Sequence, residues 1–348
     1  MLRRRIPLAL VSLAAAVLAF APAAQAQVSL RVMTHASFDL PKDLLARFEK
    51  DAGVSLQLIK AGDAGEMLNK LILTRARPVA DAVFGIDNTL LPRALAAKVL
   101  EPYEGPAMRR DGRADLPGPL VPVDYGYVNL NIDKAWFASH KLALPRSLEE
   151  LAGPTYRNLL VVQNPATSSP GQAFLLATIA GLGEEGAFDW WARMRTNGVK
   201  VVKGWSEAYY TEFSRNGGTR PIVVSYATSP AAEVFYSEKK ISEPPTANLF
   251  LKGGVYRQVE GAGLVRGGNP AAREAAGRFI EFMRSPDVQQ ALQTSMWMFP
   301  VESGVPRDPV MQHADEPAVF DALTPEQLGK AAAWQQRWTR VVLKQTGR

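Results

Sequence analysis

The chain reads Val199-Lys200-Val201-Val202-Lys203-Gly204-Trp205-Ser206-Glu207, and fifteen residues later Ile222-Val223-Val224-Ser225-Tyr226-Ala227-Thr228-Ser229-Pro230. The two apolar, β-branched runs predict buried strands. Ligands of open α/β sheets bind just outside the carboxyl ends of such strands, so we expect Trp205, Glu207, Tyr226, Thr228 and Ser229 at a ligand site. Aromatic faces with a carboxylate and hydroxyls suit a flat organic cation. The alternative is that Trp205 and Tyr226 are core aromatics that cap the sheet.

Strands and helices alternate on the N-terminal side of these runs. Strands are predicted at 28–34, 54–59, 80–84 and 159–163, with a helix at 41–51, one capped by Asp63, and one opened by Gly85-Ile86-Asp87-Asn88. This rhythm predicts an α/β fold of mainly parallel sheets flanked by helices. Ser169 followed by Pro170 predicts another helix start, whose free N–H groups could cradle a polar ligand or simply be capped.

Two extended segments interrupt the rhythm, at 125–131 after a proline-rich stretch and at 256–265. We interpret them as crossover strands that hinge two lobes. Lobe one is predicted to comprise residues 27–124 plus 257–348, and lobe two residues 125–256. Thr324-Pro325-Glu326-Gln327 is typical of a capping box that starts the last helix, where Trp334 and Trp338, four residues apart, are expected in the core.

The first 26 of the 348 residues have the pattern of a secretory signal peptide. Arg3–Arg5 form the positive region, 6–20 the apolar core, and Ala24-Gln25-Ala26 the cleavage motif, so cleavage is predicted after Ala26. Losing these three arginines lowers the formal charge from +6 to +3, which argues against nucleic-acid binding. Cysteine is absent, which excludes disulfides and thiolate metal sites. We expect a soluble, monomeric exported protein, periplasmic in a Gram-negative cell.

Enzyme signatures are sparse. The three histidines, His35, His140 and His313, are not at metal-ligand spacing, and no nucleophile elbow or phosphate-binding loop is present. An exported hydrolase would lack a recognisable nucleophile–base pair. Tyr209-Tyr210, with His35, keeps open the alternative of a ferric-iron-binding protein. Otherwise no metal site is predicted.

The mature sequence as a whole resembles the periplasmic thiamine-binding proteins of bacterial ABC importers, within the two-lobed type II solute-binding superfamily. The matching motifs, in order, are Asp63 before a Leu-Asn-Lys-Leu helix, Gly85-Ile86-Asp87-Asn88, Pro122-Val123-Asp124-Tyr125-Gly126-Tyr127, Thr167-Ser168-Ser169-Pro170-Gly171, Lys203-Gly204-Trp205-Ser206-Glu207-Ala208-Tyr209, Ser225-Tyr226-Ala227-Thr228-Ser229-Pro230 and Trp297-Met298-Phe299-Pro300.

The resemblance implies capture of thiamine, or its mono- and diphosphate, for a membrane permease and its ATPase, with no cofactor and no catalysis. Two positions depart from the family pattern: His35 stands where Tyr is expected, and Ala232 where an aromatic is frequent, with Tyr236 one helical turn later as a substitute. The implied ligand contacts are Asp63, Ala64, Ser168, Ser169, Trp205, Tyr226, Ala227, Thr228, Ser229 and Trp297, with His35, Asp87, Asp124, Glu207 and Tyr236 as secondary candidates.

Overall fold

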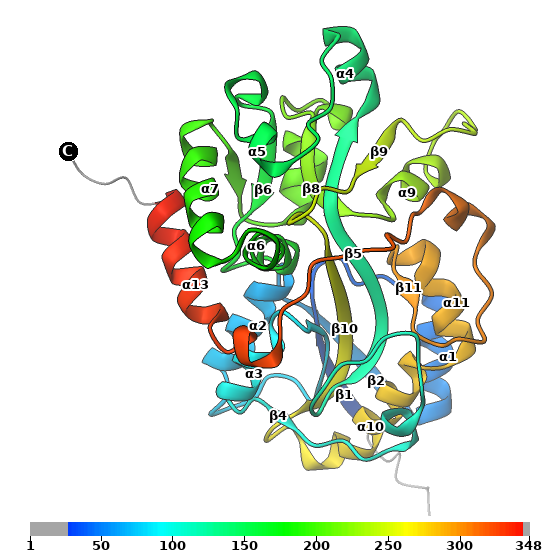
Figure 1. Ribbon diagram of the computed structural model, residues 1–348. Coiled ribbons are helices and arrows are strands. Elements are labelled where there is room, and N and C mark those ends of the chain that lie inside the picture. The colour runs from blue at the N-terminus through cyan, green and yellow to red at the C-terminus, as the bar shows by residue number, and fades with distance from the viewer. Residues whose placement is uncertain (1–26, 344–348) are drawn as a thin grey trace, which may run out of the picture.

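One mixed sheet runs through the molecule, shown in Figure 1 as a computed structural model in which residues 27–343 are described. The predicted signal peptide lies outside the described residues. The strands of the sheet are β1 (Val28–Thr34), β2 (Val54–Lys60), β3 (Ala82–Asp87), β4 (Leu100–Glu101), β5 (Val121–Asp133), β6 (Leu160–Gln163), β7 (Lys200–Val202), β8 (Ile222–Tyr226), β9 (Thr246–Leu249), β10 (Tyr256–Val265) and β11 (Phe299–Pro300).

The helices cover both faces of this sheet. Within residues 27–343, none is long and apolar enough to cross a bilayer. They are α1 (Lys42–Ala52), α2 (Ala64–Leu73), α3 (Leu91–Ala96), α4 (Lys134–His140), α5 (Leu148–Leu151), α6 (Ser169–Leu182), α7 (Glu184–Thr196), α8 (Trp205–Glu207), α9 (Ser229–Phe235), α10 (Arg273–Met283), α11 (Pro286–Ser295), α12 (Pro325–Leu328) and α13 (Ala331–Trp338).

Two parallel groups of strands are joined by an antiparallel pair. The main strand order is β2-β1-β3-β10-β5-β8-β6-β7. The neighbours β2-β1-β3 are parallel, and so are β8-β6-β7. Between them β10 is antiparallel to β3 and to β5, and β5 is antiparallel to β8. The predicted parallel groups and crossover strands are therefore present, but the two groups belong to one continuous sheet, which the sequence pattern did not predict.

The half of the molecule that contains β1–β3 has a core on each face of the sheet. Successive residues of a strand point to opposite faces, and Val32 and Met33 of β1 enter different cores accordingly. One core contains α1 and α10, represented by Phe48 and Phe279, whereas the other contains buried residues of α2. Both faces of these strands are thus covered, as a parallel sheet requires.

The other half packs β6 and β8 against α6, α7 and α13 in one core. Residues 169–179 of α6 are all buried, since the helix lies between the sheet and other helices. Trp334 and Trp338 are buried as predicted. The predicted last helix is in fact two helices. The capping box at Thr324 starts the short α12, and α13 begins two residues after α12 ends. In space α13 lies beside α6 and α7, on the side of predicted lobe two (Figure 1).

Two helix starts differ from prediction. Gly85, Ile86 and Asp87 belong to β3, and the helix begins at Leu91. The reason is that the Asp87 carboxylate accepts hydrogen bonds from the N–H groups of Thr89 and Leu90, which forms a turn before the helix. At α6 the N-cap is Ser168 rather than Ser169, and its side chain makes no capping hydrogen bond.

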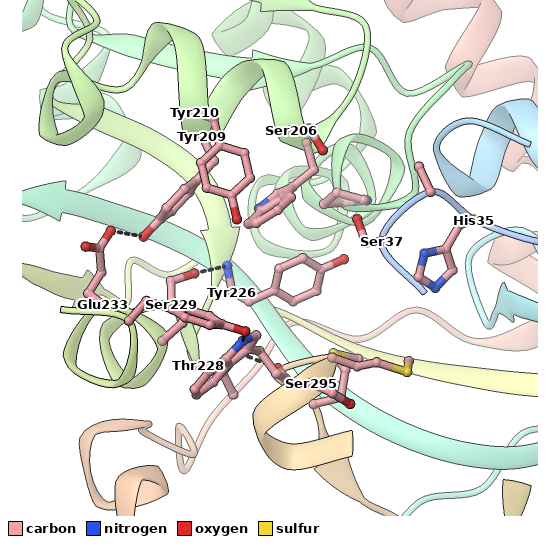
Figure 2. A pocket seen from close by; sticks show the side chains of 18 of the residues that line it. His35, Ser37, Ser206, Tyr209, Tyr210, Tyr226, Thr228, Ser229, Glu233 and Ser295 are labelled. Atoms are coloured by element: carbon pink, nitrogen blue, oxygen red, sulfur yellow. Dashed lines mark hydrogen bonds between the residues drawn. The ribbon is translucent and has the colours of Figure 1, made fainter. Parts of the chain in front are cut away.

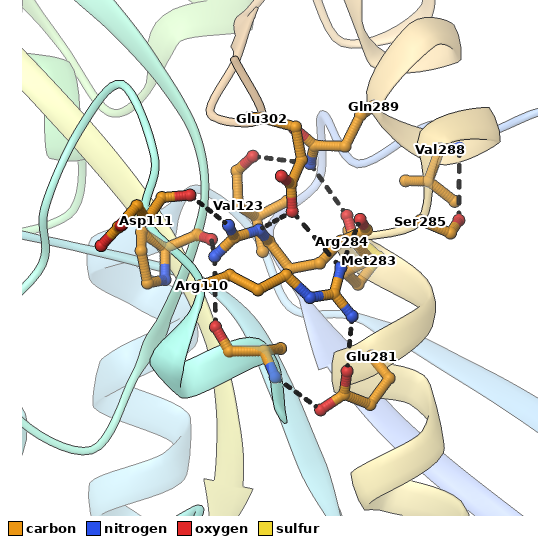
Figure 3. A network of polar contacts seen from close by, with 12 residues as sticks. Arg110, Asp111, Val123, Glu281, Met283, Arg284, Ser285, Val288, Gln289 and Glu302 are labelled. Atoms are coloured by element: carbon orange, nitrogen blue, oxygen red, sulfur yellow. Dashed lines mark hydrogen bonds and ion pairs between the residues drawn. The ribbon is translucent and has the colours of Figure 1, made fainter. Parts of the chain in front are cut away.

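A buried arginine anchors the first end of the long strand β5 (Figure 3). The Arg284 side chain is fully buried. Its Nε donates to Glu302 Oε1 at 2.7 Å, and Nη1 donates to the carbonyls of Ala107 and Pro122 at 3.3 and 3.2 Å. Gln289 Nε2 donates to the Val123 carbonyl at 2.8 Å. The end of α10, the start of α11 and the start of β5 are therefore held together by charge-assisted and neutral hydrogen bonds.

We expect Arg284→Ala to lower the free energy of unfolding by about 3 kcal/mol, because it takes the buried donor away from Glu302 and from the carbonyls of Ala107, Asp111 and Pro122. The matched control is Arg278→Ala on the same helix, whose exposed ion pair with Glu274 should contribute less than about 0.5 kcal/mol. Urea unfolding followed by circular dichroism measures both. Equal, small losses would contradict an anchoring role for Arg284.

Candidate ligand-binding site

A cavity of about 560 Å³ opens between the two halves, within the range of small-molecule sites. Residues that follow the carboxyl ends of β1, β2, β7 and β8 line it, namely His35, Asp63, Trp205 and Thr228. The loop between α11 and β11 adds Trp297. Strand ends of both parallel groups thus meet at one place, which explains why residues far apart in sequence converge here.

Trp205 forms one wall of the cavity. Its ring stacks on Tyr209 with centroids 5.1 Å apart, and its Nε1 donates to Ser225 Oγ at 2.8 Å. Tyr209 in turn donates its hydroxyl to Glu233 at 2.8 Å. The Tyr209 ring on one face and the Ser225 hydroxyl at the edge therefore hold the indole in one orientation.

Tyr226 lies in the centre of the site, between the tyrosine pair and His35 (Figure 2). Burial, with the negative charge of Glu260 nearby, raises the pKa of its phenol well above the ordinary value, so the ring stays neutral. Two small hydroxyls lie beside Tyr226, one from Ser225 in β8 and one from Ser229 at the start of α9. Ser229 Oγ lies 2.9 Å from Ser225 Oγ and accepts from the Tyr226 N–H at 3.4 Å.

Trp297 forms another aromatic wall with Phe235, the last residue of α9, and with Tyr236, which follows it. Its ring centroid lies 5.3 Å from Phe235 and 5.5 Å from Tyr236. Its backbone has φ of 59°, a left-handed conformation that is uncommon for a bulky residue. Thr228 Oγ1 donates to the Trp297 carbonyl at 2.6 Å and holds this conformation from the other half of the molecule.

Asp63 connects the two halves on the other side of the cavity. It caps α2 by accepting from the Ala64 N–H at 2.7 Å, and its second oxygen accepts from the Trp205 N–H at 3.0 Å. A Cβ at Gly65 would lie 2.5 Å from the Thr167 backbone, so glycine is required for α2 to approach this loop. Burial raises the pKa of Asp63.

A group of acidic side chains lies under the centre of the cavity. Glu260 lines it from β10, with Asp124 of β5 and Asp87 of β3 fully buried behind. Burial raises the pKa of Asp87 to about 6 and that of Asp124 to about 8, and burial together with the nearby Asp124 raises the pKa of Glu260 well above its usual range. His35 Nε2 lies 3.4 Å from Glu260 Oε1, but burial and the nearby Lys60 lower the pKa of His35 to about 4, so it is neutral.

The comparisons with known proteins agree on one family. A family model for bacterial extracellular solute-binding proteins matches residues 78–329. The chain is 33% identical over 302 residues to the thiamine-binding periplasmic protein of Salmonella typhimurium, which covers 85% of this chain and 86% of that protein. The chain belongs to the bacterial extracellular solute-binding protein family. A solved periplasmic thiamin binding protein matches this family member with a TM-score of 0.80 at 30% identity, over 91% of this chain and 97% of that chain, which confirms the predicted fold.

A weaker match is iron uptake protein A1 of Synechocystis sp. It is 24% identical to this solute-binding protein over 303 residues, which cover 82% of this chain and 78% of that protein.

The geometry of the cavity gives little support to the iron alternative. Tyr209 already donates to Glu233, and Figure 2 shows His35 on the opposite side of Tyr226 from Tyr209 and Tyr210. Within residues 27–343, no group of three or more histidines and carboxylates is placed to hold a metal ion.

Most of the predicted contacts reach the cavity of the solute-binding protein. The lining includes, from the prediction, Asp63, Ser169, Trp205, Tyr226, Thr228, Ser229, Trp297, His35 and Tyr236.

Six predicted residues do not line it. Ala64, Ser168 and Ala227 are buried next to lining residues, Asp87 and Asp124 lie behind Glu260, and Glu207 accepts from the Lys203 N–H on the surface at 3.2 Å. These contacts stay predictions that rest on the family resemblance.

Sequence reasoning missed other residues in the lining. The most consequential is Glu260, because it stands in a strand interpreted only as a crossover; a carboxylate between Val259 and Gly261 within an apolar strand was the available signal. The others are Ala36, Ser37, Pro170, Ser206, Arg215, Asn216, Glu233, Ser237, Ser295, Met296 and Met298.

The buried acids of the solute-binding protein predict a pH dependence of stability. Since the pKa values of Asp124 and Glu260 are raised in the folded state, that state keeps protons that the unfolded chain has lost. The free energy of unfolding of the ligand-free protein should therefore fall as pH rises from about 6.5 to 8.5, by about 1.4 kcal/mol per pH unit for each retained proton. His35 contributes only below this window, because its pKa is lowered.

Thermal melts at constant ionic strength measure this effect. Asp124→Asn, which removes one acid of the pair, should flatten the profile. A melting temperature that is constant or rises over this pH window would show that these acids are ionised in the ligand-free fold.

Proposed function

We propose that this chain is a periplasmic solute-binding protein that captures thiamine, and its mono- and diphosphate, and delivers them to an ABC import permease without chemical turnover. One observation carries the proposal: the cavity has aromatic walls formed by Trp205, Tyr226 and Trp297, with buried carboxyl groups under its centre. The relatives named above bear the same ligand in their names.

The chemistry of thiamine is complementary to these walls. Its thiazolium ring carries a permanent positive charge, and an aromatic face within reach of such a cation contributes about 0.5–2 kcal/mol. Its aminopyrimidine is flat and carries donors and acceptors, which Asp63 and the hydroxyls of Thr228 and Ser229 can complement.

The hydroxyethyl or phosphate end of the ligand needs hydrogen-bond donors. The start of α6 lines the cavity at Ser169 and presents the Ser169 hydroxyl together with the positive end of a 14-residue helix. We assign this end of the cavity to the polar tail.

We propose that the two lobes close around the ligand by bending at the two crossover strands, which act as a hinge. In this proposal lobe one comprises residues 27–124 plus 257–348, and lobe two residues 125–256, with α13 packed on lobe two. The segment 1–26 serves as the signal peptide, and the mature protein acts as a monomer.

We expect Trp205→Ala to weaken thiamine binding by about tenfold or more, the scale of one lost aromatic–cation contact, with the melting temperature of the ligand-free protein nearly unchanged. Calorimetry and quenching of tryptophan fluorescence by thiamine measure the affinity. The matched control is Trp136→Ala, which removes a partly exposed indole stacked on His140, outside the cavity lining.

Three outcomes would count against the proposal. If the wild-type protein shows neither a heat of binding nor quenching of tryptophan fluorescence at saturating thiamine, the proposal is refuted. Visible charge-transfer colour with ferric iron would favour the iron alternative through Tyr209 and Tyr210. Conversion of the ligand by pure protein would favour the exported hydrolase.

A further inference from the structure

Glu260 and Asp124 face each other across the two crossover strands. They are register partners in the antiparallel pair of β10 and β5, and the register shifts immediately after Glu260. Directly opposed residues of an antiparallel pair point to the same face, with Cβ atoms about 4.5–5.5 Å apart. The two carboxyl groups are therefore forced together by the strand pairing itself.

The described part of the chain gives this pair no counter-charge. Asp124 is fully buried and Glu260 is 5% exposed. Among residues 27–343 neither Asp124 oxygen accepts from an N–H group or an alcohol hydroxyl, so the neighbour that can donate to it is a protonated Glu260 carboxyl. Within ion-pair distance of the Glu260 carboxylate, the described residues offer only the buried imidazole of His35, at 3.4 Å.

The other titratable groups near Glu260 do not supply positive charge. Asp87 and Asp63 are acidic and raise its pKa further, and Tyr226 is a neutral phenol. Lys60 acts on His35, whose pKa it lowers together with burial, so the imidazole remains uncharged.

Two adjacent buried carboxylates cannot both be ionised at neutral pH without a cation, so the pair holds one proton. Glu260 lines the cavity, whereas Asp124 lies behind it. A permanent cation placed over the cavity floor would be the missing counter-charge.

We propose that Glu260 is the residue that selects a positively charged ligand, and that the cation replaces the proton which Glu260 shares with Asp124 in the ligand-free protein. No bond is made or broken in the ligand: the Glu260 carboxyl becomes a carboxylate beside the cation, and its proton passes to the solvent. This inference rests on the proposed function, in which the cation is the thiazolium ring.

The experiment compares two probes that differ in charge but hardly in shape. Thiamine is the cation, and 3-deazathiamine, in which a neutral thiophene replaces the thiazolium ring, is its matched control. Calorimetry between about pH 6 and pH 8.5, in two buffers of different ionisation enthalpy, gives both the affinity and the number of protons exchanged.

Wild-type protein should release a proton with thiamine and none with the neutral analogue. Its affinity for thiamine should rise with pH, at most about tenfold per pH unit for one proton. Glu260→Gln, which imitates the protonated acid, should weaken thiamine binding about tenfold or more, leave the neutral analogue nearly unaffected, and abolish proton release.

Asp124→Asn is the second variant. It keeps Glu260 but removes the neighbour that shares its proton, so the preference for thiamine should persist while proton release at neutral pH diminishes. Circular dichroism melts establish that both variants fold.

The possible failures are distinguishable. If wild-type protein does not bind thiamine, the proposed function fails, and this inference with it. If it binds thiamine without proton release, and Glu260→Gln keeps the wild-type preference for the cation over the neutral analogue, only the role of Glu260 is refuted.

Discussion

The antiparallel pairing of β5 with β10 is the constraint on which the rest of the structure depends. These two strands lie between the parallel groups, and both carry the chain from one half to the other. Their pairing brings the carboxyl ends of β1 and β2 opposite those of β7 and β8, which is where the cavity forms. It also places Asp124 beside Glu260. The position of the site and the charge beneath it therefore have one structural origin.

The paired strands β5 and β10 place two buried acids side by side at the centre of the sheet, which is electrostatically unfavourable. The surrounding structure therefore has to keep these strands in place. The start of β5 is held through the Pro122 and Val123 carbonyls by Arg284 and Gln289, and its far end pairs with β8 and β9. Both ends of the strand are thus anchored, so the buried acids cannot relax by local fraying. A ligand that carries positive charge relieves the same strain, which links affinity to the architecture of the sheet.

Sequence patterns predicted the parts of the fold that depend on local order. The helix capped by Asp63 follows from capping, and the position of the ends of β7 and β8 follows from the strand-end rule, with Trp205 and Tyr226 lining the cavity as expected. The single continuous sheet depends on the pairing of strands far apart in the chain, which no local pattern reveals. The carboxylate at position 260 stood out within its apolar strand, but its pairing with Asp124 did not. The orientation of Ala64, Ala227 and Glu207 depends likewise on packing, and their side chains lie beneath or outside the cavity.

The two positions at which a departure from the family pattern is predicted, His35 and Ala232, have different surroundings in the structure. The His35 imidazole lies against residue 85, which must be a glycine: a Cβ at Gly85 would lie 2.2 Å from His35 Cδ2. It contacts Phe84 and Glu260 and remains neutral, which preserves the negative character of the cavity floor. Ala232 leaves room on α9, and Tyr236, four residues later, lines the same cavity and contacts Trp297. Tyr236 therefore presents an aromatic ring to the cavity one helical turn after position 232, and with Trp297 it keeps this wall of the cavity aromatic.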